Sequence, residues 1–314
     1  MSKKILLSGV KPTGRPHIGN YFGAMKQFVD LQNDYEAFVM IADYHALNFI
    51  QNKKEMAENI LGVALDYLAI GLDPKHVTIF KQSDVSSHTE LAWIFDTLTT
   101  MPYLMRAHAF KDAEAKNKDI SVGTFNYPML MAADILLYDT DVVPVGQDQK
   151  QHIEIARDSA QKFNNTFGET FKLPEPIILD EVAVVPGTDG QKMSKSYKNT
   201  IPLFATDEEL EKAVMGIVTD SSAGVPINVY EIHKLFRTEE QLKELYREKE
   251  GKYKELKDAL LADIITFVTP LREKRQKLAE DISIVEKILI DGSARANAVA
   301  GSKLAMVKQA IGVL

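Results

Sequence analysis

The stretch that decides the fold is Asp189–Ser196, DGQKMSKS, taken together with Lys11–Asn20, KPTGRPHIGN, near the start of the chain. Alone, DGQKMSKS is a polar loop whose ammonium and hydroxyl groups could hold phosphate oxygens. A short Lys/Ser run is more often an ordinary solvated loop. The second stretch shifts that balance, because it lies between an apolar segment and an amphipathic one, where nucleotide-binding folds hold phosphates.

Apolar and amphipathic segments alternate through the first half of the chain. Strands are expected at residues 3–7 (ended by Ser8–Gly9), 37–41, 77–80 and 142–145, and helices at 19–32, 54–71, 87–99, 127–138 and 151–163. The polar stretch 111–118 is expected to be a mobile loop, and Pro174 and Pro176 mark a passage toward DGQKMSKS. This alternation predicts an α/β fold, a Rossmann-like parallel sheet covered on both faces, with ligands at the carboxyl ends of the strands.

The pattern after residue 206 is helical throughout. Thr238 with Gln241 forms a capping-box signature, Asp207 could cap an earlier helix, and Pro270 is expected to break or kink a long one. Residues 234–277 contain twelve Lys/Arg and nine Asp/Glu, a balance that most often means a solvated helical surface. The expected division is an α/β domain over residues 1–200 and an all-helical domain over 201–314.

Composition sets wider limits. The chain has 314 residues, 45% of them hydrophobic and 26% charged, so it can form two domains with sizeable cores. It has no cysteine, which excludes disulfides and thiolate metal sites and fits a reducing cytoplasm. No apolar run approaches the ~18 residues of a membrane span. The net charge of −7 argues against a protein that coats nucleic acid, but not against a local contact with RNA.

The two motifs resemble the HIGH and KMSKS signatures of class I aminoacyl-tRNA synthetases. Asn20 at the end of the first motif, and Val145–Asp158 (VGQDQKQHIEIARD), narrow the resemblance to tryptophanyl-tRNA synthetases of bacterial type. The resemblance runs along nearly the whole chain. It implies ATP- and Mg²⁺-dependent activation of L-tryptophan, transfer to tRNA(Trp), and release of AMP and pyrophosphate. It also implies a cytoplasmic homodimer with an inserted dimerisation segment, a helical anticodon-recognition domain, and a last helix around residues 295–311 that packs back on the catalytic domain.

Activation is an in-line attack of a carboxylate on the α-phosphorus of ATP. Such a site requires positioned cations and hydrogen-bond donors rather than a catalytic triad. The resemblance assigns the catalytic roles to Lys192, Lys195 and His17, and we add Lys11 to them as a hypothesis of our own. It assigns ATP binding to Lys11, Pro12, Thr13, Gly14, His17, Gly19, Asn20, Gly146, Gln147, Asp148, Val184, Lys192, Met193, Ser194, Lys195 and Ser196. No protein ligand to a metal is expected, since Mg²⁺ would be held mainly by ATP phosphates and water.

The resemblance assigns tryptophan binding to Asp134, Tyr127, Met131, Gln149 and His45. Tyr127, Met131 and Asp134 share a helix face, which by itself would suggest an ordinary core helix. The resemblance implies that Asp134 accepts the indole N–H, which can only donate, and that Met131 packs on the ring. Phenylalanine would then leave a buried carboxylate unpaired, at a cost of about 1–3 kcal/mol or more. Tyr127 and Gln149 would hold the α-amino group, and His45 the carboxylate side.

Two positions depart from the family pattern. Lys11 stands where most bacterial members have Gln, and Ala113 stands where they commonly have Lys. We hypothesise that Lys11 supplies the triphosphate contact that position 113 lacks.

Three other identities remain open from the sequence. A tyrosyl-tRNA synthetase usually has Gly-Gly-Ser-Asp-Gln where this chain has Val-Gly-Gln-Asp-Gln. A nucleotidyltransferase of the same superfamily would lack the long helical region after residue 206. A regulatory or tRNA-binding paralogue is disfavoured by the intact His17, Lys192 and Lys195. Zinc chemistry is disfavoured because the seven histidines are scattered and cysteine is absent.

Overall fold

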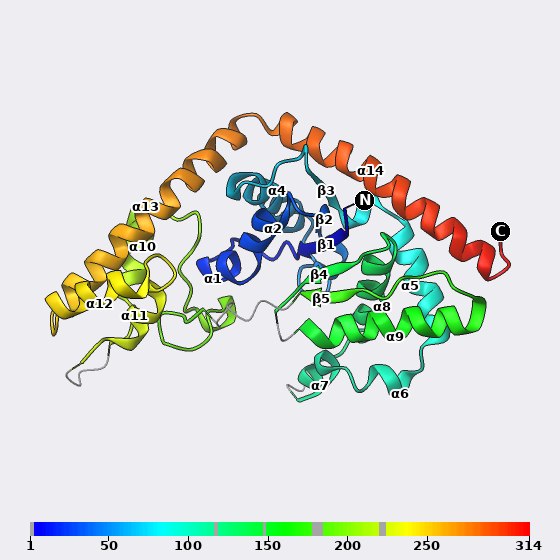
Figure 1. Ribbon diagram of the computed structural model, residues 1–314, viewed down its shortest axis with the longest axis horizontal. Helices are drawn as coiled ribbons and strands as arrows, with labels where there is room; N and C mark the ends of the chain where they lie inside the picture. Colours follow the sequence, from blue (N-terminus) through cyan, green and yellow to red (C-terminus); the bar gives the residue numbers. More distant parts are fainter. Residues whose placement is uncertain (1–2, 116–118, 147–148, 178–184, 220–223) are drawn as a thin grey trace. The chain divides into compact units, whose positions relative to one another are not determined.

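The computed structural model describes residues 3–115, 119–146, 149–177, 185–219 and 224–314 (Figure 1). The chain packs as two units, each built from separated segments. The first unit comprises Met1–Thr13, Phe28–Leu179 and Ile282–Leu314, and the second comprises Gly14–Gln27 and Asp180–Asp281. These units do not divide at residue 200, because the HIGH-like segment belongs to the second unit and the last helix to the first. The assignment of an anticodon domain and a dimerisation segment stays a prediction.

The first unit is built on a five-stranded parallel sheet with strand order β3-β2-β1-β4-β5. The strands are β1 (Ile5–Val10), β2 (Glu36–Ile41), β3 (Val77–Lys81), β4 (Val142–Pro144) and β5 (Glu175–Ile177). The order reverses between β1 and β4, which is where an open sheet of this kind binds its ligands. The predicted α/β fold class is therefore confirmed.

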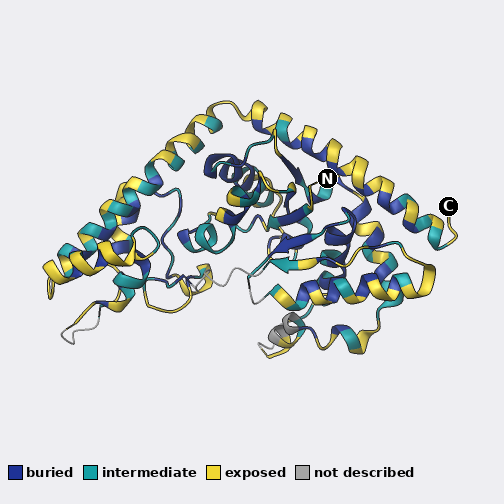
Figure 2. Ribbon diagram, in the orientation of Figure 1, coloured by how far each residue is buried: buried dark blue, intermediate teal, exposed yellow. Residues whose placement is uncertain are grey.

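The helices of the first unit cover both faces of this sheet. They are α3 (Asp43–Ala46), α4 (Lys53–Ile70), α5 (Ser87–Leu98), α6 (Met101–Leu104), α7 (His108–Ala115), α8 (Val122–Leu136), α9 (Lys150–Phe167) and α14 (Ile282–Ala310), with the 3₁₀ turn η2 (Gln82–Asp84) after β3. Figure 2 shows the central strands and the inward helix faces buried, with exposed residues along the outer helix faces. The main core includes Phe80, Phe95, Met129 and Phe163, each fully buried. Burial of such a side chain contributes about 1.5–3 kcal/mol.

Local sequence explains most element boundaries. Asn52 caps α4 by accepting from the Glu55 amide, and Gly71 ends it with φ of 112°, as the predicted stop requires. β1 runs through Ser8 and Gly9 to Val10, so the predicted end at Ser8 is too early. Gly9 pairs with Met40, and a Cβ at Gly9 would lie 2.5 Å from the Met40 carbonyl oxygen. Glycine therefore permits the close strand contact there.

Three other sequence-based expectations differ from the structure. α8 begins at Val122 rather than near Tyr127, because the Ser121 hydroxyl accepts the Thr124 amide and caps an earlier turn. α7 continues to Ala115, so residues 111–115 are helical rather than a loop. β5 was not predicted because it contains Pro176, which is tolerated in an edge strand such as this one.

The second unit holds the segment after β1 against a helical group. Its helices are α1 (Ile18–Asn20), the π-helical turn η1 (Tyr21–Met25), the start of α2 (Lys26–Leu31), the 3₁₀ turn η4 (Lys195–Tyr197), α10 (Asp207–Met215), α11 (Ile227–His233), α12 (Glu239–Glu248) and α13 (Tyr253–Glu280). Tyr21 and Phe22 contact Phe267, and Phe22 also contacts Phe236, with ring centroids 5.2–5.4 Å apart. This aromatic cluster fixes the segment to α13.

The capping predictions in this unit have mixed outcomes. The capping box of Thr238 and Gln241 is confirmed, whereas Thr206, not Asp207, caps α10 through a box with Glu209. α13 continues through Pro270, so a break there is excluded. Ile264 and Val268 are fully buried just before the proline, and this packing holds the helix together around it.

The last helix, α14, packs on β3, α5 and α4 of the first unit. At Gly292 a Cβ would stand 1.8 Å from the Ile79 carbonyl oxygen, so helix and strand approach at backbone distance. Ser293 Oγ donates to Asp84 Oδ2 (2.8 Å), and Asn297 Nδ2 donates to the Asp84 carbonyl (2.8 Å). Residues 295–311 were expected to form a last helix that packs back on the catalytic domain. Most of them belong to the longer helix α14, which completes the first unit.

Candidate active site

The HIGH-like segment and the DGQKMSKS loop lie side by side in the second unit. His17 forms an isolated antiparallel bridge with Pro202, and the Ile18 amide donates to the Ile201 carbonyl (2.9 Å). Lys195 Nζ donates to the Gly14 carbonyl (2.9 Å). A Cβ at Gly19 would lie 3.3 Å from the Met193 Cβ, so the two motifs are in contact. Their proximity was expected from the resemblance and could not be derived from spacing.

His17 is the best-defined group of this pair. It is buried, and its Nδ1 accepts the Asn20 amide (3.2 Å) while Asn20 Oδ1 accepts the His17 amide (3.1 Å). Burial and the charge of Lys195 lower the pKa of His17 to about 4. The ring is therefore neutral at pH 7, and because Nδ1 is an acceptor, its proton is on Nε2. His17 can thus donate one hydrogen bond to a ligand oxygen.

Asn199, which the sequence analysis missed, organises the loop. It is buried, its Nδ2 donates to Asp189 Oδ1 (2.7 Å) and to the Lys192 carbonyl (3.1 Å), and its Oδ1 accepts the Ser194 amide (2.8 Å). The Met193 amide also donates to the Val185 carbonyl (2.9 Å). Met193 is therefore anchored inward, whereas Lys192, Lys195 and Ser196 are exposed. A polar residue placed just after a motif loop is the only sequence signal that could have drawn attention to Asn199.

Other residues predicted to bind ATP lie at carboxyl ends of strands in the first unit. Lys11, Pro12 and Thr13 follow β1, and Gly146 follows β4, on the two sides of the switch in strand order. Lys11 Nζ lies 5.0 Å from the centroid of the Phe49 ring. Gln147, Asp148 and Val184 lie outside the described residues, as does the side chain of Ala113.

Asp134 lies at the centre of the residues that are predicted to bind tryptophan. Its side chain is 0% exposed and receives four hydrogen-bond contacts from three side chains. His45 Nε2 donates to Oδ2 (2.8 Å), His88 Nδ1 donates to Oδ1 (2.6 Å), and Gln82 Nε2 contacts both oxygens (2.8 and 3.0 Å). Burial alone would raise the pKa of Asp134, but these hydrogen bonds and the two histidines lower it to about 2. Asp134 is therefore a carboxylate at neutral pH.

Asp134 is already paired without a ligand, and the expectation that phenylalanine would leave this carboxylate unpaired stays a prediction. Three protein donors already satisfy the roughly four acceptor positions of a carboxylate. His45 contacts Asp134, and its predicted role at the tryptophan carboxylate stays a prediction.

The other residues that are predicted to bind tryptophan lie around the contact between His45 and Asp134. The Tyr127 ring meets His45 edge-on, with centroids 5.9 Å apart, and the Tyr127 hydroxyl is hydrogen-bonded to His152 Nε2. Met131 is half-buried and packs against the main core. Gln149 is at the N-cap of α9, where its amide donates to the Gly146 carbonyl (2.9 Å). The structure thus brings His45, Tyr127 and Asp134 together.

Gln82 and His88 were missed by sequence analysis. Gln82 directly follows β3, and Oε1 of Gln82 accepts the Tyr44 amide (3.1 Å). His88 lies in the first turn of α5, and its Nε2 accepts the Tyr138 hydroxyl (2.9 Å). A polar residue next to a strand's carboxyl end was the available signal for Gln82, and nothing local marks His88.

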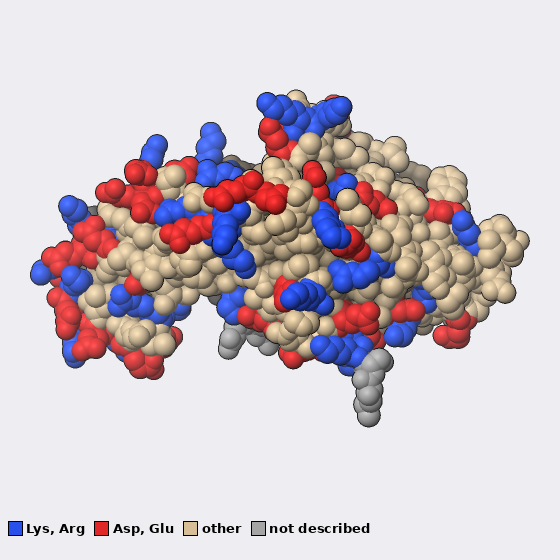
Figure 3. Space-filling view, turned by 90° about the horizontal axis from the view of Figure 1, so that it is seen from above, with Lys and Arg blue, Asp and Glu red and all other residues tan. Residues whose placement is uncertain are grey.

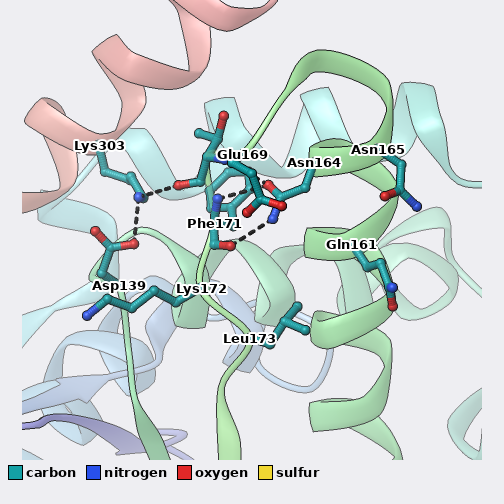
Figure 4. Close-up of a pocket in the computed structure, with 10 residues that line it drawn as sticks. Asp139, Gln161, Asn164, Asn165, Glu169, Phe171, Lys172, Leu173 and Lys303 are labelled. Atoms are coloured by element: carbon teal, nitrogen blue, oxygen red, sulfur yellow. Dashed lines mark hydrogen bonds and ion pairs between the residues drawn. The ribbon is translucent and has the colours of Figure 1, made fainter.

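A pocket of about 570 Å³ opens at the amino ends of β4 and β5, away from these residues (Figure 4). Lys303 of α14 reaches its wall, where Nζ donates to the Thr170 carbonyl (2.6 Å) and pairs with Asp139 (2.5 Å). Nζ also lies 5.5 Å from the centroid of the Phe171 ring. With its charge paired, Lys303 serves to anchor α14, and the pocket lies at the opposite edge of the sheet from the expected ligands.

Two findings bear on membranes and metals. In the part of the chain that the structure describes, no helix is long and apolar enough to cross a membrane. Within the same residues, no group of three or more His, Cys, Asp or Glu side chains is arranged to hold a metal ion.

Comparison with known proteins gives consistent matches. The family described as tRNA synthetases class I (W and Y) matches residues 2–284. A tryptophan–tRNA ligase of Fusobacterium nucleatum is 48% identical over 98% of each chain, and one of Rhodopirellula baltica is 47% identical over 95% of this chain and 96% of the relative. The crystal structure of Campylobacter jejuni tryptophanyl-tRNA synthetase complexed with ADP and tryptophan has a TM-score of 0.91 and 45% identity, covering 98% of this chain and 99% of that one. The chain therefore belongs to the class I tRNA synthetases of the tryptophan and tyrosine family.

Proposed function

We propose that this protein activates L-tryptophan with ATP and transfers it to tRNA(Trp). A tryptophan carboxylate oxygen attacks the α-phosphorus, the bond to the β-phosphate bridging oxygen breaks, and pyrophosphate leaves with its electron pair. A ribose hydroxyl of the tRNA then attacks the tryptophanyl carbonyl, and AMP leaves. The buried, ionised Asp134 among donor side chains is the observation that most favours an indole substrate, because indole nitrogen only donates.

The contact between the two motifs supports a role in binding ATP phosphates. His17 offers a neutral Nε2–H donor, and Lys192 and Lys195 project from a loop held by Asn199. Such fixed donors and cations stabilise the charge that develops on phosphate oxygens during transfer. Mg²⁺ would neutralise the same oxygens and be held mainly by phosphate and water.

A pocket in the second unit supports contact with tRNA. It encloses about 530 Å³ between α11, α12 and the start of α13, and its lining includes Tyr230, Tyr246, Lys243 and Arg247. Unpaired RNA bases stack on aromatic rings, and nearby cations neutralise their phosphates. Figure 3 shows basic and acidic side chains interspersed on the face drawn, so we assign RNA binding to local contacts of this kind.

The proposal extends to a cytoplasmic homodimer. Several exposed apolar side chains lie on the segment between the two halves of the sheet, namely Trp93 of α5, Met101 of α6, Met105 just after it, and Val122 of α8. Their exposed fractions range from 46% to 77%, and the proposed dimer would cover them.

The test is ATP–pyrophosphate exchange with each of the twenty amino acids, repeated with Asp134→Ala. We expect exchange with tryptophan alone and its loss in the variant. Exchange that depends on tyrosine would replace the substrate while keeping the reaction. No exchange with any amino acid, from a protein that still binds ATP or tRNA, would exclude the proposed activity. Charging of tRNA(Trp) by the unmodified protein then tests the second step.

A further inference from the structure

The carboxylate of Asp134 is closed to any ligand in this structure. Its side chain is 0% exposed, so an indole N–H can reach an oxygen only after a covering group moves. The three side chains that donate to the carboxylate lie closest to it. Their freedom to move decides which of them a ligand can displace.

Two of these donors are held from more than one side. His88 is fully buried and is fixed at both ring nitrogens, by Asp134 at Nδ1 and by the Tyr138 hydroxyl at Nε2. Gln82 is also fully buried, contacts both carboxylate oxygens, and accepts the amides of Tyr44 and His45 at Oε1 (3.1 and 3.4 Å). Rotating either side chain would break several buried hydrogen bonds at once, which is costly.

His45 is held far less. Its ring has one hydrogen bond, from Nε2 to Asp134 Oδ2, and among the described residues its other nitrogen has no partner. Its side chain is 9% exposed, whereas the side chains of His88 and Asp134 are 0% exposed. It also lies on α3, a helix of only four residues, and meets the Tyr127 ring edge-on. His45 is thus the donor that can leave at the lowest cost.

We propose that tryptophan binds by exchange, with its indole N–H replacing the His45 Nε2–H on Oδ2 of Asp134 while His88 and Gln82 keep their contacts. This inference rests on the proposed function. No covalent bond changes, and the proton stays on each ring nitrogen. His45 satisfies the buried carboxylate in the free protein, and the substrate must bring its own donor to take that place.

The exchange explains selectivity for tryptophan without requiring a carboxylate oxygen that lacks a donor in the free protein. A ligand without N–H either leaves His45 in place, and then competes with its ring for space, or displaces it and leaves Oδ2 one donor short. A tryptophan isostere with sulfur in place of the indole N–H, 3-benzothienylalanine, should therefore bind ~10- to 100-fold more weakly than tryptophan.

The direct test is NMR of the full chain labelled with ¹⁵N-histidine, titrated with tryptophan. Signals are assigned with His45→Ala and with the matched control His76→Ala, an exposed histidine that pairs with Asp73 (3.4 Å). We expect tryptophan to move the His45 Nε2 signal to the position of a nitrogen without its carboxylate partner. The His88 signals should keep theirs, and His76 should be unchanged.

Calorimetry gives the second readout. Because His45→Ala removes the donor that must leave, this variant should bind tryptophan at least as tightly as the unmodified protein. Unchanged His45 signals on tryptophan binding, or a His45→Ala variant that binds tryptophan more weakly than the unmodified protein, would overturn the exchange. The latter would instead place His45 on the substrate carboxylate. Failure of the proposed function looks different, because the unmodified protein would then not bind tryptophan.

Discussion

Replacing Gly292 by alanine tests how closely α14 is seated on β3. In an exposed helix position, glycine to alanine stabilises by about 1 kcal/mol. At Gly292 the new Cβ would stand 1.8 Å from the Ile79 carbonyl oxygen and 2.8 Å from its carbon, and both atoms belong to backbone inside the sheet. A carbon–oxygen contact of about 3.3 Å, the short end of the ordinary range, requires a shift of roughly 1.5 Å.

The expected cost follows from that shift. Overpacking of a close-packed interior usually costs about 1–3 kcal/mol, and here neither backbone can yield locally. The gain in helix propensity offsets about 1 kcal/mol, so Gly292→Ala should destabilise the protein by a net of up to ~2 kcal/mol. For a chain of 314 residues that corresponds to a fall in Tm of up to about 3 °C.

The same helix offers a matched control. A Cβ added at Gly301 would meet no atom within 4 Å, and the residue is exposed, so Gly301→Ala should raise Tm slightly through helix propensity alone. The assay is thermal unfolding of both variants followed by circular dichroism. If Gly292→Ala were as stable as Gly301→Ala, the backbone contact between α14 and β3 would be refuted.

Three further predictions concern other residues. Asn199→Ala removes three hydrogen bonds from the DGQKMSKS loop, so pyrophosphate exchange should slow by ~10- to 100-fold while tryptophan affinity, measured by calorimetry, stays unchanged. Burial raises the pKa of Asp96 to about 6, so its ionisation lowers stability as pH rises from about 4 to 6. Asp96→Asn should then stabilise by up to ~1 kcal/mol at pH 7.5, after allowance for its partial exposure, and show no gain at pH 4 in thermal unfolding. Lys11→Gln should raise the KM for ATP in exchange assays with no change in tryptophan affinity, and an unchanged KM would refute the compensation hypothesis for position 113.

The sheet could be predicted because its strands are short apolar runs bounded by glycine and polar residues. β1 to β4 were found for this reason, with errors of one to three residues at their ends. β5 was missed because Pro174 and Pro176 signal a loop, and only its place at the sheet edge makes Pro176 acceptable. The predicted start of α8 is too late because a single serine such as Ser121 is a weak helix signal in sequence, whereas its capping hydrogen bond is plain in the structure.

The residues of the candidate site likewise fall into those that the sequence could predict and those that it could not. The motif residues were recognisable because each motif is continuous in sequence. The partners of Asp134 were not, since Gln82 and His88 come from η2 and α5, and hydrophobic periodicity within one helix carries no information about such contacts. That protein donors already hydrogen-bond the Asp134 carboxylate likewise depends on the assembled fold. Sequence reasoning could find Asp134 but not its environment.

The seating of α14 has a consequence for synthesis on the ribosome. β3 and α5 are made early, yet the helix that packs on them includes Ala296, Ala300 and Val307, which are translated more than 190 residues later than α5 and are fully buried. Until those residues emerge, the nascent chain keeps an apolar face and a strand edge uncovered, where it can associate with other chains. A stop codon between Asp281 and Ala296 would therefore release a chain whose first unit is incomplete, although the strands in the described part of the chain have been made. Chaperone binding to such a product, rather than loss of a binding residue, would then determine its fate.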